Sequence, residues 1–107
     1  MVKEYQENIN MNKDQIKEIV TNVIRDYCKL NEIEVAELNE YTPLIGRESI
    51  LDSIGLVNVI VDIETAFLDE DVEISLTSDA AMSSRISPFR TIGALSNFIA
   101  RQIGVEA

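Results

Sequence analysis

Apolar residues recur at helical spacing along residues 13–30, and this periodicity constrains the fold more than any other feature of the chain. The apolar positions lie three or four residues apart: Ile16, Ile19, Val20, Val23, Ile24, Tyr27 and Leu30. Such spacing places them on one face of an amphipathic helix. Asn12 can accept hydrogen bonds from the first free amides, and Leu30-Asn31 offers a C-terminal end. We therefore predict a helix over residues 13–30.

Two further segments show the same periodicity. One starts at Asp52-Ser53, whose side chains can both accept hydrogen bonds from first-turn amides. Its buried stripe is predicted to consist of Leu56, Val59, Ile60, Ile63 and Phe67. The other starts at Thr91, which can act as the N-cap, and ends before Gly104. Its stripe is predicted to consist of Ile92, Leu95, Phe98, Ile99 and Ile103.

The segments between these helices carry weaker patterns. Residues 31–52 hold scattered apolar positions interrupted by Pro43 and Gly46, which predicts a long loop. Because a loop of this length in a small domain needs support, we expect its apolar residues to pack against the core. Residues 74–90 are rich in serine and have room for a short helix around Asp79 to Ser84, capped by Ser78.

The length and the polar N-terminus define the domain organisation. A chain of 107 residues suits one compact domain. Its first dozen residues, MVKEYQENINMN, are polar and aperiodic, so they lack the apolar surface needed to offset the entropy of ordering. We expect a flexible lead over residues 1–12 and a single domain over 13–107. The predicted fold class is all-α, a small bundle of three main helices plus a short fourth helix.

The charge balance limits the partners that the chain can bind. It contains 19 acidic and 9 basic residues, a net charge of -10, which would repel a phosphate backbone and an anionic membrane surface. Nucleic acid is therefore not an expected partner. The longest apolar-leaning run, Ile54 to Val61, is shorter than the roughly 18 residues of a spanning helix, so no stable membrane insertion is expected. The lone Cys28 and the lack of an apolar leader indicate a cytoplasmic setting.

The residue inventory argues against catalysis and metal binding. Histidine is absent, so a serine or cysteine nucleophile lacks its usual base, and Cys28 is expected to be a buried thiol. The acidic group after Phe67 does not match a calcium loop. A loop starting at Asp69 would have Ile74 where glycine is needed and Ala80 where glutamate is needed. We therefore predict no catalytic residues and no metal site.

Ser53 lies between the long loop and the second predicted helix, directly after Asp52. The plain interpretation of such a serine is a helix cap. An exposed hydroxyl at this place can also be modified by another enzyme. The two residues alone leave both interpretations open.

The surrounding stretch LDSIGL, with its Asp52-Ser53-Ile54 signature and a long apolar helix ending in DIETAF, resembles the acyl carrier protein family. The resemblance covers roughly residues 13–103, including the order of the helices and a closing helix after TIGAL. It implies that Ser53, beside Asp52, carries 4′-phosphopantetheine derived from coenzyme A, whose thiol holds an acyl group as a thioester. It also implies that the chain is not an enzyme.

The same resemblance implies a set of protein partners. These are a phosphopantetheinyl transferase and the enzymes that load and transfer acyl groups, with the carrier acting as a monomer. Brief docking that is steered by charge suits such partners. The candidate docking residues are the acidic residues near the second helix: Asp52, Asp62, Glu64 and Asp69.

Two positions indicate which kind of carrier this is. Gly55 and Asn58 stand where carriers of the fatty-acid type usually have acids. This favours a specialised pathway, such as lipid, polyketide, peptide or surface-polysaccharide assembly. The alternatives are an aminoacyl or peptidyl carrier and an unmodified acidic helical adaptor whose second helix docks a partner helix.

A second apolar face follows Ser53 along the predicted helix. Ile54, Val57 and Val61 come one, four and eight residues after the serine and line up along one side. Leaving an acyl chain in water costs about 0.8 kcal/mol of hydrophobic free energy for each exposed methylene. These residues are therefore candidates for a groove that shelters the acyl chain. The alternative is that they pack against the other helices.

Overall fold

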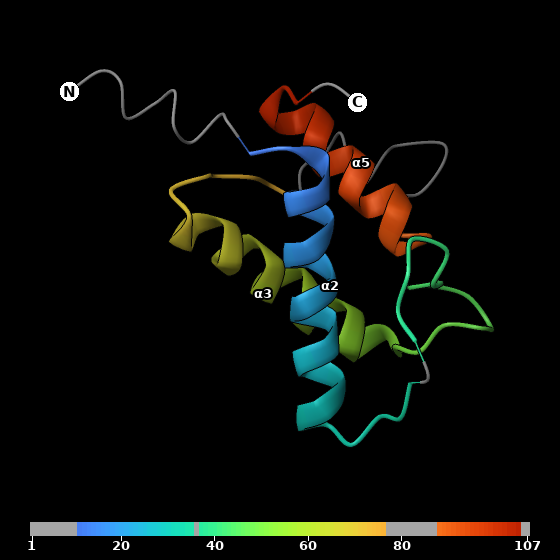
Figure 1. Ribbon diagram of the computed structural model, residues 1–107. Helices are drawn as coiled ribbons and strands as arrows, with labels where there is room; N and C mark the ends of the chain where they lie inside the picture. Colours follow the sequence, from blue (N-terminus) through green and yellow to red (C-terminus); the bar gives the residue numbers. More distant parts are fainter. Residues whose placement is uncertain (1–10, 36, 77–87, 106–107) are drawn as a thin grey trace.

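Three helices make up the regular structure of the protein. The computed structural model describes residues 11–35, 37–76 and 88–105. The helices are α2 (Lys13–Leu30), α3 (Ser53–Asp69) and α5 (Ile92–Ile103). Figure 1 shows α2 crossing α3 and running beside α5, and α2 packs against both of them. α3 and α5 have no comparably extensive contact with each other.

The prediction of a short fourth helix is wrong for the structure as described. Residues 11–35, 37–76 and 88–105 contain three helices and no fourth. The segment Asp79 to Ser84, where the short helix was predicted, lies outside these residues. That prediction depended on a serine cap without an apolar stripe, and a short helix is marginal unless it buries an apolar face.

The predicted capping residues lie at the ends of α2 and α5. The side chains of Asn12 and Gln15 each accept the other's backbone N–H at 2.8 Å, which forms a capping box at the start of α2. Thr91 Oγ1 accepts the amide of Ala94 at 3.0 Å at the start of α5. Gly104 ends α5 with a positive φ of 83°, a conformation that favours glycine. The predicted bounds of both helices are confirmed.

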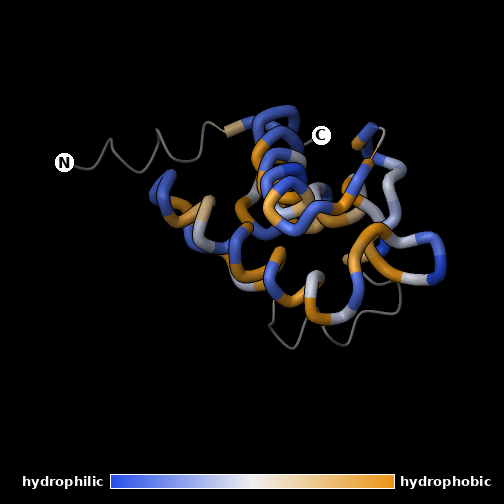
Figure 2. The backbone as a smooth tube through the Cα atoms, turned by 90° about the horizontal axis from the view of Figure 1, so that it is seen from below, coloured by the Kyte–Doolittle hydropathy of each residue, from blue (hydrophilic) through white to orange (hydrophobic). Residues whose placement is uncertain are grey.

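The core is built from one apolar stripe on each helix. The buried side chains of α2 recur every four residues. The fully buried side chains of the three helices include Ile16, Val20, Ile24, Cys28, Val59, Ile63, Phe67, Ile92, Leu95 and Ile99. Hydrophobic and hydrophilic residues alternate along the helical coils in Figure 2, as expected for amphipathic helices. Leu30, predicted to belong to the stripe of α2, is exposed because it lies at the last helical position.

The loop over residues 31–52 is attached to the start of α5. The amide of Ile92 donates to the carbonyl of Thr42 at 3.1 Å, and the amide of Gly93 donates to the carbonyl of Glu40 at 2.8 Å. Among the described residues of this loop, Leu44 and Leu51 have buried apolar side chains. The prediction that the loop packs against the core is therefore confirmed.

Residues 72–76, which we call the strap, lie outside the helices and are alternately buried and exposed. Its buried side chains are Val72, Ile74 and Leu76. The side-chain amide of Gln102 on α5 accepts the N–H of Ser75 at 2.7 Å and donates to its carbonyl at 2.8 Å. Glu64 on α3 accepts the N–H of Leu76 at 2.7 Å. The strap thus connects α3 and α5, which contact each other little.

We predict that Gly93→Ala destabilises the fold, although the same change in an exposed helix usually stabilises it by about 0.5–1 kcal/mol. A Cβ atom at Gly93 would lie 2.8 Å from the carbonyl oxygen of Glu40, a backbone atom that cannot rotate away. The free energy of unfolding in urea should fall by about 1–3 kcal/mol, as in other overpacked sites.

The matched control for Gly93→Ala is Asn97→Ala, on the exposed side of the same helix. It should change the free energy of unfolding by no more than about 0.5 kcal/mol. A Gly93→Ala protein that is as stable as the unchanged protein would show that the loop does not approach α5 this closely.

We predict that Gln102→Ala loosens the strap while the helices stay folded. The change removes both hydrogen bonds to Ser75, so the amide of Ser75 should exchange its hydrogen faster, and the global free energy of unfolding should fall by only about 0.5–1.5 kcal/mol. Arg101→Ala, at the preceding exposed position, is the control. Equal hydrogen-exchange rates of the Ser75 amide in the unchanged protein and in both variants would show that Gln102 does not hold the strap.

Candidate functional site

Asp52 caps the start of α3. Its backbone is extended, and its Oδ1 atom accepts the amide of Gly55 at 2.7 Å. Its carbonyl accepts the amide of Leu56 at 2.9 Å. A carboxylate at this position also interacts favourably with the positive end of the helix dipole. The capping role predicted for Asp52 is confirmed.

Ser53 is the first residue of α3 and is exposed. Within the described parts of the chain its hydroxyl makes no hydrogen bond, because Asp52 already supplies the cap. The capping role predicted for Ser53 is therefore not found. A serine hydroxyl that is exposed and unbonded can be reached by another enzyme without breaking any contact of the fold.

Gly55 lies in the first turn of α3, beneath a side chain of α2. It is buried, and a Cβ atom there would lie 3.0 Å from the hydroxyl oxygen of Tyr27 and 3.1 Å from Oδ1 of Asp52. A side chain at this position would therefore require Tyr27 to shift by a few tenths of an ångström. The first turn of α3 and Tyr27 of α2 thus lie in close contact.

An apolar stripe runs along the outer face of α3. Its members and their exposed fractions are Ile54 at 73%, Val57 at 60%, Val61 at 52% and Leu68 at 60%. The alternative that Ile54, Val57 and Val61 pack against the other helices is wrong. Leu68 was missed by the sequence analysis, although its spacing of seven from Val61 places it on the same face. The acyl-groove assignment of the first three residues stays a prediction.

The predicted docking acids differ in their surroundings. Asp62 and Asp69 are exposed on α3, so their carboxylates are accessible to a partner. Glu64 is half-buried, and its carboxylate accepts the amide of Leu76 in the strap at 2.7 Å. Glu64 therefore has a structural contact that the sequence analysis did not predict.

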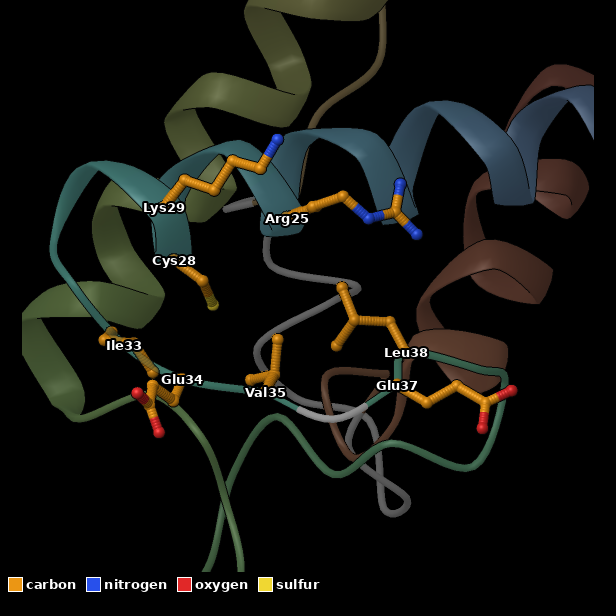
Figure 3. Close-up of a pocket in the computed structure, with 8 residues that line it drawn as sticks. All are labelled: Arg25, Cys28, Lys29, Ile33, Glu34, Val35, Glu37 and Leu38. Atoms are coloured by element: carbon orange, nitrogen blue, oxygen red, sulfur yellow. The ribbon is translucent and has the colours of Figure 1, made fainter.

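A pocket of about 860 Å³ opens between the C-terminal half of α2 and the start of the following loop (Figure 3). Its lining residues are Arg25, Cys28, Lys29, Ile33, Glu34, Val35, Glu37 and Leu38. The Cys28 side chain points from α2 toward the loop, and burial raises the pKa of its thiol. The thiol therefore stays protonated at neutral pH, and the predicted buried thiol is confirmed. None of the predicted site residues lines this pocket.

Within the residues that the structure describes, no group of three or more histidine, cysteine or acidic side chains is placed to hold a metal ion. None of the three helices is long and apolar enough to cross a membrane. No protein-family model, no curated protein and no solved structure matches the chain. The site is therefore interpreted from its own residues and geometry.

We predict that two adjacent alanine substitutions at the head of α3 differ in their effect on stability. Asp52→Ala removes the cap and should lower the free energy of unfolding by about 0.5–2 kcal/mol. Ser53→Ala removes no hydrogen bond of the described residues and should change it by no more than about 0.5 kcal/mol. Urea denaturation of both variants tests this order, and the reverse order would make Ser53 the structural cap.

Proposed function

We propose that the protein is an acyl carrier that bears 4′-phosphopantetheine on Ser53. The observation that carries this proposal is the exposed, unbonded hydroxyl of Ser53 at the first position of α3, directly after the capping Asp52. The sequence around it, LDSIGL, has the Asp-Ser-hydrophobic signature of carriers. The order of α2, a long loop, α3 and the closing α5 also agrees with this family.

The head of α3 has the chemistry to hold a phosphodiester. The amides of Ser53 and Ile54 lie in the first turn, where helical hydrogen bonding leaves N–H groups free. These amides and the helix dipole favour an anionic group at this end. Ser53 Oγ would attack the phosphorus of coenzyme A that bears the pantetheine and give its proton to the transferase. The diphosphate P–O bond would break, and adenosine 3′,5′-bisphosphate would leave. When attached, the arm supplies the thiol that holds an acyl group as a thioester.

A carrier of this kind needs no catalytic side chain of its own. The chain lacks histidine, and burial keeps its one thiol protonated. Acid, base and nucleophile would come from the transferase and from the enzymes that load and transfer the cargo. The protein would present the arm as a monomer in the cytoplasm, where coenzyme A is the donor.

Two uncharged residues in the first half of α3 support a specialised pathway over a fatty-acid role. A Cβ atom at Gly55 would lie 3.0 Å from the hydroxyl oxygen of Tyr27, a tight contact, and the side-chain amide of Asn58 donates to the carbonyl of Ile54 at 3.1 Å. The proposed cargo is an acyl group of lipid, polyketide or related assembly. An aminoacyl or peptidyl cargo is the alternative within the same class.

One observation favours a different class of function. The apolar stripe on α3 is more than half exposed along its whole length, as expected of a surface that docks another protein. An unmodified helical adaptor would use this stripe while Ser53 stayed free. The two functions differ in whether Ser53 becomes covalently modified.

We predict that incubation with coenzyme A and a broad-range phosphopantetheinyl transferase adds the mass of one phosphopantetheine group to the chain. Intact-mass spectrometry measures the addition, and fragmentation should place it on Ser53. Ser53→Ala should abolish it. Ser75→Ala, which removes the other exposed serine of the described residues, should leave it unchanged. An unmodified wild-type chain would favour the adaptor.

A further inference from the structure

We propose that Tyr27 of α2 is a positioning residue, which holds the first turn of α3 in the orientation that presents Ser53 for modification. This inference rests on the proposed function, because it concerns the residue that would accept the arm. The contact that carries it joins the Tyr27 side chain to Gly55, two residues after Ser53.

The first turn of α3 has no fully buried side chain of its own. Of its four residues, Ser53 and Ile54 are exposed and Leu56 is half-buried. Gly55 is buried, but it has no side chain to insert between neighbouring elements. The turn that carries Ser53 therefore depends on contacts that other elements make with it, and without them it would open locally.

Tyr27 supplies such a contact at Gly55. A Cβ atom built on Gly55 would lie 3.0 Å from the hydroxyl oxygen of Tyr27 and 3.3 Å from its Cε2 atom. The other near atom is Oδ1 of Asp52, at 3.1 Å, which belongs to the cap of the same helix. Tyr27 thus covers the backbone of Gly55 from α2, and glycine allows this close approach.

The position of Tyr27 is itself fixed by its surroundings. Its carbonyl accepts the backbone amide of Asn31 at 3.1 Å and the side-chain amide of Asn31 at 2.9 Å. Ile24 and Cys28, on the same helix, are buried in the core, and the half-buried Tyr27 packs against that core. A side chain held in this way can position a functional group on a neighbouring element.

The orientation of Ser53 matters because its oxygen must meet the phosphorus of coenzyme A. A misplacement of about 1 Å can lower the rate of such a reaction by roughly 100-fold. Leu51 and Val59 are buried before and after the first turn, and Asp52 caps the turn from within its own helix. Tyr27 joins the turn itself to α2, which these residues do not do.

The test measures kcat and KM for the transfer of phosphopantetheine from coenzyme A to the full chain by a broad-range transferase. Tyr27→Ala should lower kcat/KM by roughly 10-fold, because the first turn loses its contact with α2. Tyr27→Phe keeps the ring and should stay within about 2-fold of the unchanged protein. Tyr41→Ala, at an exposed loop position, is the matched control and should have no effect.

Ile16→Val separates positioning from stability. Ile16 is fully buried on α2 about three turns before Tyr27, so this variant should unfold at lower urea but keep the kcat/KM of the unchanged protein. A second readout uses the unmodified chain. Tyr27→Ala, but not Ile16→Val, should speed hydrogen exchange of the Leu56 amide, which donates to the carbonyl of Asp52 at 2.9 Å.

A double-mutant cycle tests the contact directly. Gly55→Ala should displace Tyr27 by a few tenths of an ångström and lower kcat/KM by roughly 2- to 5-fold. Adding Tyr27→Phe removes the oxygen nearest to the new methyl group, so part of this loss should be recovered. Adding Tyr41→Phe instead should recover none. This cycle decides the inference if Tyr27→Ala does not fold.

The inference is overturned if folded Tyr27→Ala accepts the arm with unchanged kcat/KM, if Tyr27→Phe or Ile16→Val loses as much as Tyr27→Ala, or if the changes at Gly55 and Tyr27 are additive. These outcomes leave the proposed function intact, because the arm is still transferred. An unchanged protein that never accepts the arm contradicts the proposed function instead, and exchange of the Leu56 amide then still tests the contact.

Discussion

The packing of α2 against both α3 and α5 is the contact on which the rest of the structure depends. The buried side chains of α2 repeat every four residues, at Ile16, Val20, Ile24 and Cys28, and form one wall of the core. α3 and α5 lie against this wall but contact each other little. Segments outside the helices join them instead. The strap connects α3 and α5, and the loop before α3 is bonded to the start of α5.

This arrangement fixes the head of α3 without using Ser53. Asp52 provides the cap, and Tyr27 of α2 packs over Gly55 in the first turn. The serine next to the cap is left exposed, with no hydrogen bond within the described residues. A modification of its hydroxyl therefore requires no rearrangement of the core. The cap and the exposed hydroxyl thus belong to two different residues.

Local signals predicted the features that depend on neighbouring residues. Helical periodicity and the capping residues Asn12, Thr91 and Gly104 gave the bounds of α2 and α5, because caps and apolar stripes act within a few residues. The strap was missed because buried and exposed residues alternate over only five positions, which is too short a pattern to support a prediction. Its bonds to Glu64 and Gln102, like the contact between Tyr27 and Gly55, join residues distant in sequence and carry no local signal.

The central claim is that the hydroxyl of Ser53 can be modified without changing the packing of the core. Amide and methyl NMR spectra recorded before and after transfer of phosphopantetheine test this claim most directly. The account predicts that the amides of Ser53 and Ile54 shift, while the methyl signals of Val20, Ile63 and Leu95 in the core stay in place. Shifts spread throughout the core methyls, or an unchanged Ser53 amide in a chain modified elsewhere, would contradict it.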